Sequence, residues 1–135
     1  ISIDPRKPNA LFYKGIILGK LKKHEEALNC FENVHNKHPS HMDALFHIGI
    51  ELAELENHKK ALEIFDQILA SHKDNVNVIY AKSRSKSALG EFPESLELLK
   101  KAVNLNPKTI RTWAKEEKIF EKLHNNDQFR KLVKL

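Results

Sequence analysis

The sequence predicts an all-α protein built from stacked antiparallel helix pairs. Three observations favour this fold class: a 34-residue period, helical spacing of the apolar residues inside each period, and a shortage of helix breakers. The 135-residue chain contains only 4 Gly and 5 Pro, spread along its length rather than gathered in runs. A period of this length is typical of a repeated supersecondary unit, in which each copy covers the apolar face of the next.

The period is clearest in the first two copies of the unit. The stretch "ALFYKGIILG" near the start returns one period later as "ALFHIGIELA". Residues 10–39 and 44–73 are identical at 12 of 30 positions. Two copies this similar predict the same pair of helices twice.

Within the first unit the apolar or small residues of one helix recur at three- and four-residue steps: Leu11, Gly15, Leu18 and Leu21. After a break at "KKHEE", a second helix carries a similar set: Ala27, Leu28, Phe31 and Val34. Each unit is therefore expected to be two antiparallel helices of about 12 to 15 residues.

Helix-boundary residues lie where the units and helices meet. Ser40 and Asp43 have the spacing of a capping box before the second unit. Gly90 is expected to end a helix, and Pro93 suits the first turn of the helix that follows.

A glycine recurs in the middle of the first helix of the first two units, as Gly15 and Gly49. Glycine in a helix interior costs about 0.5–1 kcal/mol relative to alanine, so its repeated use indicates a packing role. We expect Gly15 to face Ala27, so that the two helices approach closely, and Phe31 to fill the space towards the next unit.

Later copies are weaker but keep the spacing. In the third copy, Leu89 continues the series of Leu21, and Pro107 stands two periods after Pro39. A fourth copy is expected to begin near Ile110, with Trp113 in the position of Leu11 and Leu45.

These residues resemble the tetratricopeptide repeat, whose 34-residue signature is W-x2-L-G-x2-Y, then A-x3-F, then P. The first copy has Gly15, Ala27, Phe31 and Pro39 at the matching positions, and the second has Lys73 in place of the proline. The third departs most, with three replacements of motif residues: Ser83, Lys86 and Ser95. The resemblance implies a right-handed α-solenoid of about three and a half repeats.

The repeat frame divides one solenoid domain, residues 1–135, into five segments. They are the end of a preceding repeat at 1–7, full repeats at 8–41, 42–75 and 76–109, and a partial or capping repeat at 110–135. Because Pro5 stands one period before Pro39, we expect the chain to belong to a longer array.

The resemblance also implies the function, because such arrays bind peptides or protein surfaces in a concave groove lined by the first helix of each repeat. The apolar groove candidates are Phe12, Ile16, Phe46, Ile50 and Tyr80. The polar candidates are His47, Asn77, Arg84, Arg111 and Lys118. A groove that is apolar at one end and basic at the other suits a protein or peptide with an apolar anchor and an acidic residue.

Two alternatives remain open for these positions. The aromatic residues at the fifth position of each unit, Phe12, Phe46 and Tyr80, also fit a buried core stripe. Repeats that grip a C-terminal carboxylate use Lys and Asn in the first repeat, Asn in the second, and Lys and Arg in the third. The matching positions here hold, in the same order, Phe12, Ile16, His47, Asn77 and Ala81. None of the five matches, so that role is rejected. A clamp that uses Arg84 and Arg111 remains an alternative.

No pattern of residues indicates an enzyme, so we expect no catalytic residue, cofactor or metal. His35, His38 and His41 are three residues apart, but the Pro and Ser between them break the helix and no further ligand has suitable spacing. Cys30 has no neighbouring base in the sequence, which favours a structural thiol over a nucleophile.

The net charge of +5 keeps nucleic acid as an alternative partner class. Its candidate site is the basic, serine-rich run "AKSRSKSALG" at 81–90, for which a solvated helix face is the favoured interpretation. A third alternative is a structural module that self-associates end to end. The sequence has a single cysteine and no apolar run long enough for a membrane span, so a soluble, cytoplasmic protein without a membrane partner is expected.

Overall fold

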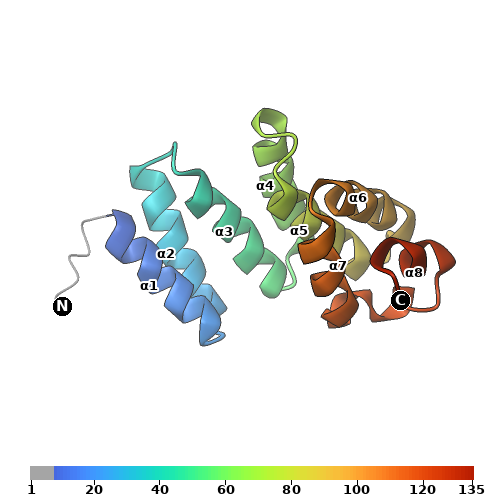
Figure 1. The fold of residues 1–135 in the computed structure, drawn as a ribbon. Coiled ribbons are helices and arrows are strands. Elements are labelled where there is room, and N and C mark those ends of the chain that lie inside the picture. The colour runs from blue at the N-terminus through green and yellow to red at the C-terminus, as the bar shows by residue number, and fades with distance from the viewer. Residues whose placement is uncertain (1–7) are drawn as a thin grey trace. The chain divides into compact units, whose positions relative to one another are not determined.

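A computed structural model describes residues 8–135, which form helices joined by short turns (Figure 1). In chain order they are α1 (Pro8–Lys20), α2 (His24–Lys37), α3 (Met42–Glu54), α4 (His58–Ser71), α5 (Val76–Ala88), α6 (Phe92–Leu105), α7 (Pro107–Glu116), the 3-10 helix η1 (Lys118–Leu123) and α8 (Asp127–Val133). The predicted all-α fold is confirmed, with no strand among these residues. The expected end of a preceding repeat, at 1–7, lies outside the described residues.

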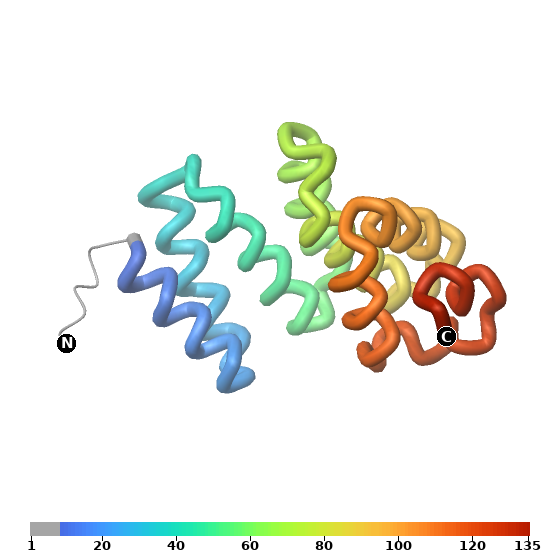
Figure 2. Tube along the Cα trace, in the orientation of Figure 1, coloured from blue at the N-terminus to red at the C-terminus, as the bar shows by residue number. Residues whose placement is uncertain are grey.

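The chain divides into two compact units, Ile1–Ile68 and Leu69–Leu135. In the first, α1 packs beside α2 and α2 beside α3, and the chain reverses direction after each helix (Figure 2). In the second, α5 pairs with α6, and α7 and α8 both pack on α6. No helix in the described part of the chain combines the length and apolar composition that a bilayer crossing requires.

The turn inside each helix pair uses a left-handed residue at the same repeat position. Lys22, Glu56 and Gly90 have φ angles of 61°, 66° and 78°, and one repeat period separates each from the next. The residue after each donates its N–H across the turn, as Lys23 does to the Leu18 carbonyl at 2.9 Å. The prediction that Gly90 ends a helix is confirmed, because α5 stops two residues before it.

Replacing Lys22 by glycine should stabilise the protein, because a side chain in the left-handed region costs about 1–2 kcal/mol that glycine avoids. We expect Lys22→Gly to raise the free energy of unfolding by about 1 kcal/mol, after the added flexibility of the unfolded chain is included. Lys14→Gly, inside α1, removes the same side chain and should instead lower it by about 0.5–1 kcal/mol. Urea titration of both variants measures the difference, and a loss of stability in Lys22→Gly would contradict the interpretation.

The close approach of the paired helices depends on a glycine that lies against an aromatic ring. A β-carbon added to Gly15 would lie 2.7 Å from the Phe31 ring, and one added to Gly49 would lie 2.5 Å from the Phe65 ring. Distances this short would force the ring or the backbone to move. A β-carbon added to either glycine would thus first meet the phenylalanine of the second helix, not the alanine that we expected.

The third helix pair has different residues at the positions where the first two pairs make their close contact. Ser83 stands where the first two pairs have glycine, Ser95 where they have alanine, and Leu99 where they have phenylalanine. Ser83 Oγ donates to the Ser95 carbonyl at 2.8 Å, and Ser95 Oγ donates to the Ser83 carbonyl at 2.9 Å. The smaller leucine leaves room for the serine, and the two hydroxyls bond each helix to the other.

The fourth copy begins three residues earlier than the sequence period predicts. Only Asn106 separates α6 from α7: its N–H bonds to the Ala102 carbonyl, and its side chain accepts from the Thr109 N–H at 3.4 Å. Ile110 is consequently fully buried, whereas Trp113 is 40% exposed. The expectation that Trp113 takes the position of Leu45 is therefore wrong.

Two other boundary predictions have opposite outcomes. The helix α3 is capped by His41, whose Nδ1 accepts from the Ala44 N–H at 3.0 Å, so the predicted capping box of Ser40 and Asp43 is wrong. Pro93 lies in the first turn of α6, as predicted.

Exchange of residues between the helix pairs tests the packing of glycine on phenylalanine. Gly49→Ser alone should cost about 1–3 kcal/mol of stability, because the new side chain meets the Phe65 ring. Combined with Phe65→Leu, which makes room, the cost should fall below the sum of the single variants by about 0.5–3 kcal/mol. Chemical denaturation of the wild type, the two single variants and the double variant measures the coupling between the two positions. Strictly additive costs would argue against direct contact.

Candidate functional site

A pocket of about 360 Å³ lies in the first unit, among α1, α2 and α3. One wall is formed by Ile16 of α1 and Ile50 of α3, which are both half-buried. They are equivalent residues of successive repeats, one period apart. Both were predicted to face a groove, and the structure brings them to one pocket.

The accessible aromatic lining of the pocket is the half-buried His47 ring, which is supported by the fully buried Phe31 ring. The His47 ring stacks on the Phe31 ring, with centroids 5.0 Å apart and an interplanar angle of 22°. Burial lowers the pKa of His47, more strongly than nearby Asp43 raises it. The neutral imidazole that this favours suits an apolar surface.

A polar group closes the other end of the pocket. His24 Nδ1 lies 2.6 Å from Glu51 Oε2, which joins the start of α2 to α3. Glu51 is only 5% exposed, and burial raises its pKa despite the bond and charge from His24. Gly19 makes room for this carboxyl group, because a β-carbon there would lie 2.6 Å from Glu51 Oε1.

Charged side chains complete the lining of the pocket. Lys20 and Lys22 come from the end of α1 and its turn, and Glu54 comes from α3. Neither lysine forms an ion pair with any residue in the described part of the chain. The pocket thus combines apolar walls, a buried carboxyl group, two exposed ammonium groups and the exposed carboxylate of Glu54.

Comparison with known families agrees with the repeat pattern. Two family models, both described as tetratricopeptide repeat, match residues 9–41 and 52–119. The chain belongs to the tetratricopeptide repeat family. The predicted resemblance is confirmed.

Several solved structures share this tetratricopeptide repeat fold. MamA from Desulfovibrio magneticus RS-1 is 20% identical, with a TM-score of 0.72, over 95% of this chain and 71% of that one. TTC0263 from Thermus thermophilus is also 20% identical, with a TM-score of 0.76, over 95% of this chain and 72% of that one. The first TPR of Spaghetti (RPAP3), bound to the HSP90 peptide SRMEEVD, is 16% identical, with a TM-score of 0.71, over 99% of this chain and 96% of that one. At these identities the likeness shows the fold alone, and a search of curated proteins found no match.

The predicted aromatic positions of the repeats have different surroundings. The Phe12 ring lies among the rings of Phe31, His41 and His47, with centroids 5.1 to 5.5 Å apart. Phe46 is half-buried, with its centroid 6.2 Å from that of Phe65. Neither Phe12 nor Phe46 lines the pocket.

In the second unit, the aromatic position is occupied by a core residue. Tyr80 is 4% exposed and packs between the rings of Trp113 and Phe120, at 5.5 and 5.9 Å. Burial, together with the nearby Glu117 carboxylate, raises the pKa of Tyr80. At this repeat, the alternative of a buried core stripe describes the structure.

The predicted basic residues of the second unit mostly bond within the protein. Arg84 Nε pairs with the Glu117 carboxylate, and Arg111 Nε donates to the Leu132 carbonyl at 2.9 Å. Lys118 is exposed at the start of η1, and Asn77 is exposed on α5. All four residues belong to the second unit, whereas the pocket described above lies in the first.

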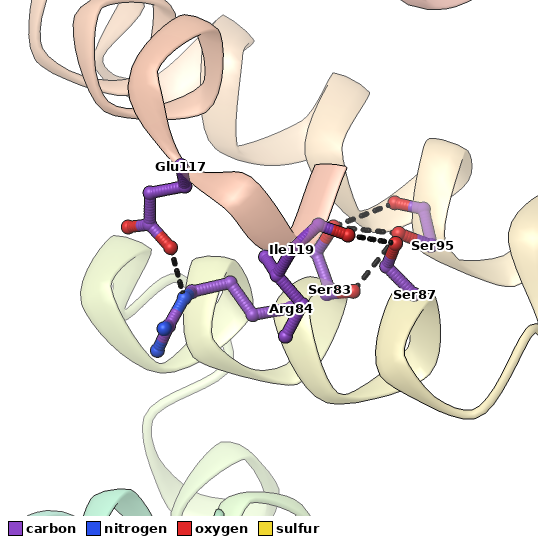
Figure 3. Close-up of polar contacts among 6 residues, drawn as sticks. All are labelled: Ser83, Arg84, Ser87, Ser95, Glu117 and Ile119. Carbon is purple, nitrogen blue, oxygen red and sulfur yellow. Dashed lines mark hydrogen bonds and ion pairs between the residues drawn. The ribbon is translucent and has the colours of Figure 1, made fainter. Parts of the chain in front are cut away.

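The serine-rich run at 81–90 proves to be a packing surface (Figure 3). Ser83 and Ser95 bond α5 to α6, and Ser87 Oγ donates to the Ile119 carbonyl at 2.9 Å. Lys86 Nζ lies 2.9 Å from Glu91 Oε2. The predicted solvated face is wrong for the serines, because Ser83, Ser85 and Ser87 are buried.

His41 and Cys30 occupy structural positions. Among the described residues, no group of three or more His, Cys, Asp or Glu side chains could hold a metal ion. His41 caps α3, and Cys30 is a buried free thiol whose pKa is raised, chiefly by burial. A raised thiol pKa disfavours the nucleophilic thiolate.

Sequence reasoning missed the polar end of the pocket. His24 and Glu51 are 27 positions apart and belong to no motif. The one available signal was that Glu51 replaces the apolar Ile17 of the preceding repeat. A carboxyl group at a normally buried position predicts a bonding partner.

The raised pKa of Glu51 predicts that this residue makes the stability depend on pH. The folded state holds the proton more tightly than the unfolded state, so Glu51 contributes stability below its ordinary pKa, and that contribution is lost as pH rises through its raised value. Glu51→Gln stays neutral, so its stability relative to the wild type should increase over the pH range that starts near 4, where an ordinary glutamate begins to ionise. Thermal melts across this range measure it, with Glu32→Gln, at an exposed site, as the control. Parallel profiles for wild type and Glu51→Gln would contradict the assignment.

Proposed function

We propose that the first unit is a protein-interaction module that binds a peptide segment of a partner protein in the pocket. An apolar side chain of the ligand inserts between Ile16 and Ile50, against the half-buried His47 ring. The observation that carries the proposal is the pocket itself, a concave site with apolar walls and a few charged groups at its edge.

Charge at the edge of the pocket favours an acidic residue beside the apolar anchor. Lys20 and Lys22 are exposed, so they can approach a carboxylate without breaking an existing ion pair among the described residues. Glu51 is bonded to His24 and buried, so it contributes less negative charge to the surface than an exposed carboxylate would. An apolar residue followed by Asp or Glu is therefore the ligand class that we propose.

Structural relatives support a peptide ligand. The tetratricopeptide repeat of Spaghetti (RPAP3) is bound to an HSP90 peptide, and YrrB is described as a TPR protein with an unusual peptide-binding site. Because residues expected for a carboxylate clamp are absent at positions such as Phe12 and Ile16, we propose recognition through an internal apolar side chain rather than a chain terminus.

Nucleic acid is a weaker candidate than protein. Arg84 and Lys86, two of the three basic residues in the run 81–90 that motivated this alternative, each pair with a glutamate, and the adjacent serines bond between helices. Binding phosphates would require these pairs to break, which removes much of the electrostatic gain.

Peptide selection tests the proposed function directly. A phage-displayed library of random peptides is selected on the 135-residue chain, and the recovered peptides are synthesised and titrated by fluorescence anisotropy. We expect a shared large apolar residue with Asp or Glu close to it. Ile50→Asp should weaken binding at least tenfold, which is about 1.4 kcal/mol, and Lys22→Glu should weaken it less.

Two controls make the result specific to the pocket. Ile17→Asp places the same charge on another face of α1, where the side chain is 56% exposed, and should leave the affinity unchanged. Circular dichroism melts verify that each variant folds. Selected peptides that bind wild type and both Ile50→Asp and Lys22→Glu equally well would refute the pocket as the site.

A further inference from the structure

The pair of His24 and Glu51 at the polar end of the pocket is not a feature of every repeat. His24 has a counterpart one period later, His58, so the repeat pattern accounts for the histidine. The positions equivalent to Glu51 hold Ile17 in the preceding copy and Ser85 in the following one. Packing of the repeats therefore does not require a carboxyl group at this position, and its presence in the lining of the pocket calls for another explanation.

The number of protons on this pair decides what the second nitrogen of the His24 ring can do. The bond of 2.6 Å between His24 Nδ1 and Glu51 Oε2 contains one proton, and Nε2 is an acceptor when the pair holds no other. A second proton makes Nε2–H a donor, whether the pair is then imidazolium with carboxylate or imidazole with carboxylic acid. Burial raises the pKa of Glu51, which helps the pair to hold this second proton.

The Nε2 atom lies where a ligand in the pocket can reach it. His24 lines the pocket, and its side chain is 21% exposed. Within the described part of the chain, Nε2 makes no hydrogen bond, because Glu54 Oε2 lies 4.0 Å from it, which is too far. A carboxylate of the ligand can therefore accept from Nε2–H without displacing a bonded group of the protein.

The charges of the pocket favour the same form of the pair. The lining contains two lysines and two glutamates, so its formal charge is zero when both carboxylates are ionised and the imidazoles of His24 and His47 are neutral. One proton added to the pair makes the lining positive, which suits an acidic ligand. Further charged residues next to His24 line a separate hollow, outside the pocket: Lys23, Glu25 and Glu26.

We propose that His24 determines the specificity of the pocket for an acidic residue, by donating a hydrogen bond from Nε2 to the carboxylate of the ligand. The inference rests on the proposed function, because His24 would contact the same ligand in the same pocket. Since only the form of the pair with the second proton donates from Nε2, binding is linked to proton uptake. Affinity for an acidic ligand therefore increases as pH falls from about 8 to about 6, a range in which an ordinary imidazole gains a proton and an ordinary glutamate of the ligand stays ionised.

Two peptides that differ in one residue test the proposal. Both are acetylated and amidated, with a leucine in a glycine and serine background; in one the leucine is followed by glutamate, and in the other by glutamine. Each is titrated into the isotope-labelled 135-residue chain by NMR, at constant ionic strength. Affinity for the glutamate peptide should rise about fivefold between about pH 8 and about pH 6, whereas affinity for the glutamine peptide should stay constant.

Substitutions of the histidine place the pH dependence on one residue. His24→Gln should bind the glutamate peptide with the same affinity at every pH, close to that of the wild type at the alkaline end. His38→Gln makes the same change at the exposed C-terminal end of α2 and should keep the wild-type profile. If melts show that His24→Gln is unfolded, because Glu51 has lost its partner, the double variant His24→Gln/Glu51→Gln removes the buried charge and should give the same flat profile.

The possible outcomes separate the role of His24 from the proposed function. Peptides that bind in the pocket, as judged by loss of binding in Ile50→Asp, but with equal affinity at all pH values would overturn the role of His24 and leave the proposed function intact. A pH dependence that persists in the His24 variants would also overturn it. No binding of either peptide at any pH would contradict both proposals.

Discussion

The contact between a glycine of one helix and a phenylalanine of the next controls how the first unit is built. With no β-carbon at Gly15, the Phe31 ring lies directly on the backbone of α1. The two helices are held close, and the same ring also stacks on His47 of α3. The packing that joins α1 to α2 thus also supports His47, which lines the pocket, so stability and the candidate binding site both depend on Phe31.

The second unit pairs its helices closely by using polar side chains for hydrogen bonds inside the protein. Ser83 and Ser95 exchange hydrogen bonds between α5 and α6, and Ser87 bonds to η1 through the Ile119 carbonyl. Arg84 is paired with Glu117. Because these groups already have partners inside the protein, a run that resembles a basic, phosphate-binding segment in the sequence is mainly structural.

Helices were predictable where the repeat period is regular, and errors appear where local chemistry changes that period. The helix pairs of the first two repeats could be predicted from the recurring glycine and apolar positions, because packing requires the same residue type in each copy. The register of α7 was missed because Asn106 caps two helices at once, which shortens the connection in a way that a fixed period hides. The pair of His24 and Glu51 was missed because the two residues lie on different helices, 27 positions apart in the sequence. A contact of this kind leaves no local sequence pattern.

The two units therefore differ in what they offer a partner. The charged and polar groups of the second unit that looked most suited to binding are largely engaged: Arg84 pairs with a carboxylate, Arg111 bonds to a backbone carbonyl, and Tyr80 lies in the core. In the first unit, Lys20 and Lys22 stand beside an apolar pocket without an ion-pair partner among the described residues. Association gains most where binding breaks no existing bond, because groups that are already paired must first give up their partners. On this physical ground, we propose that recognition by this chain lies in its first unit and that the second unit is chiefly structural.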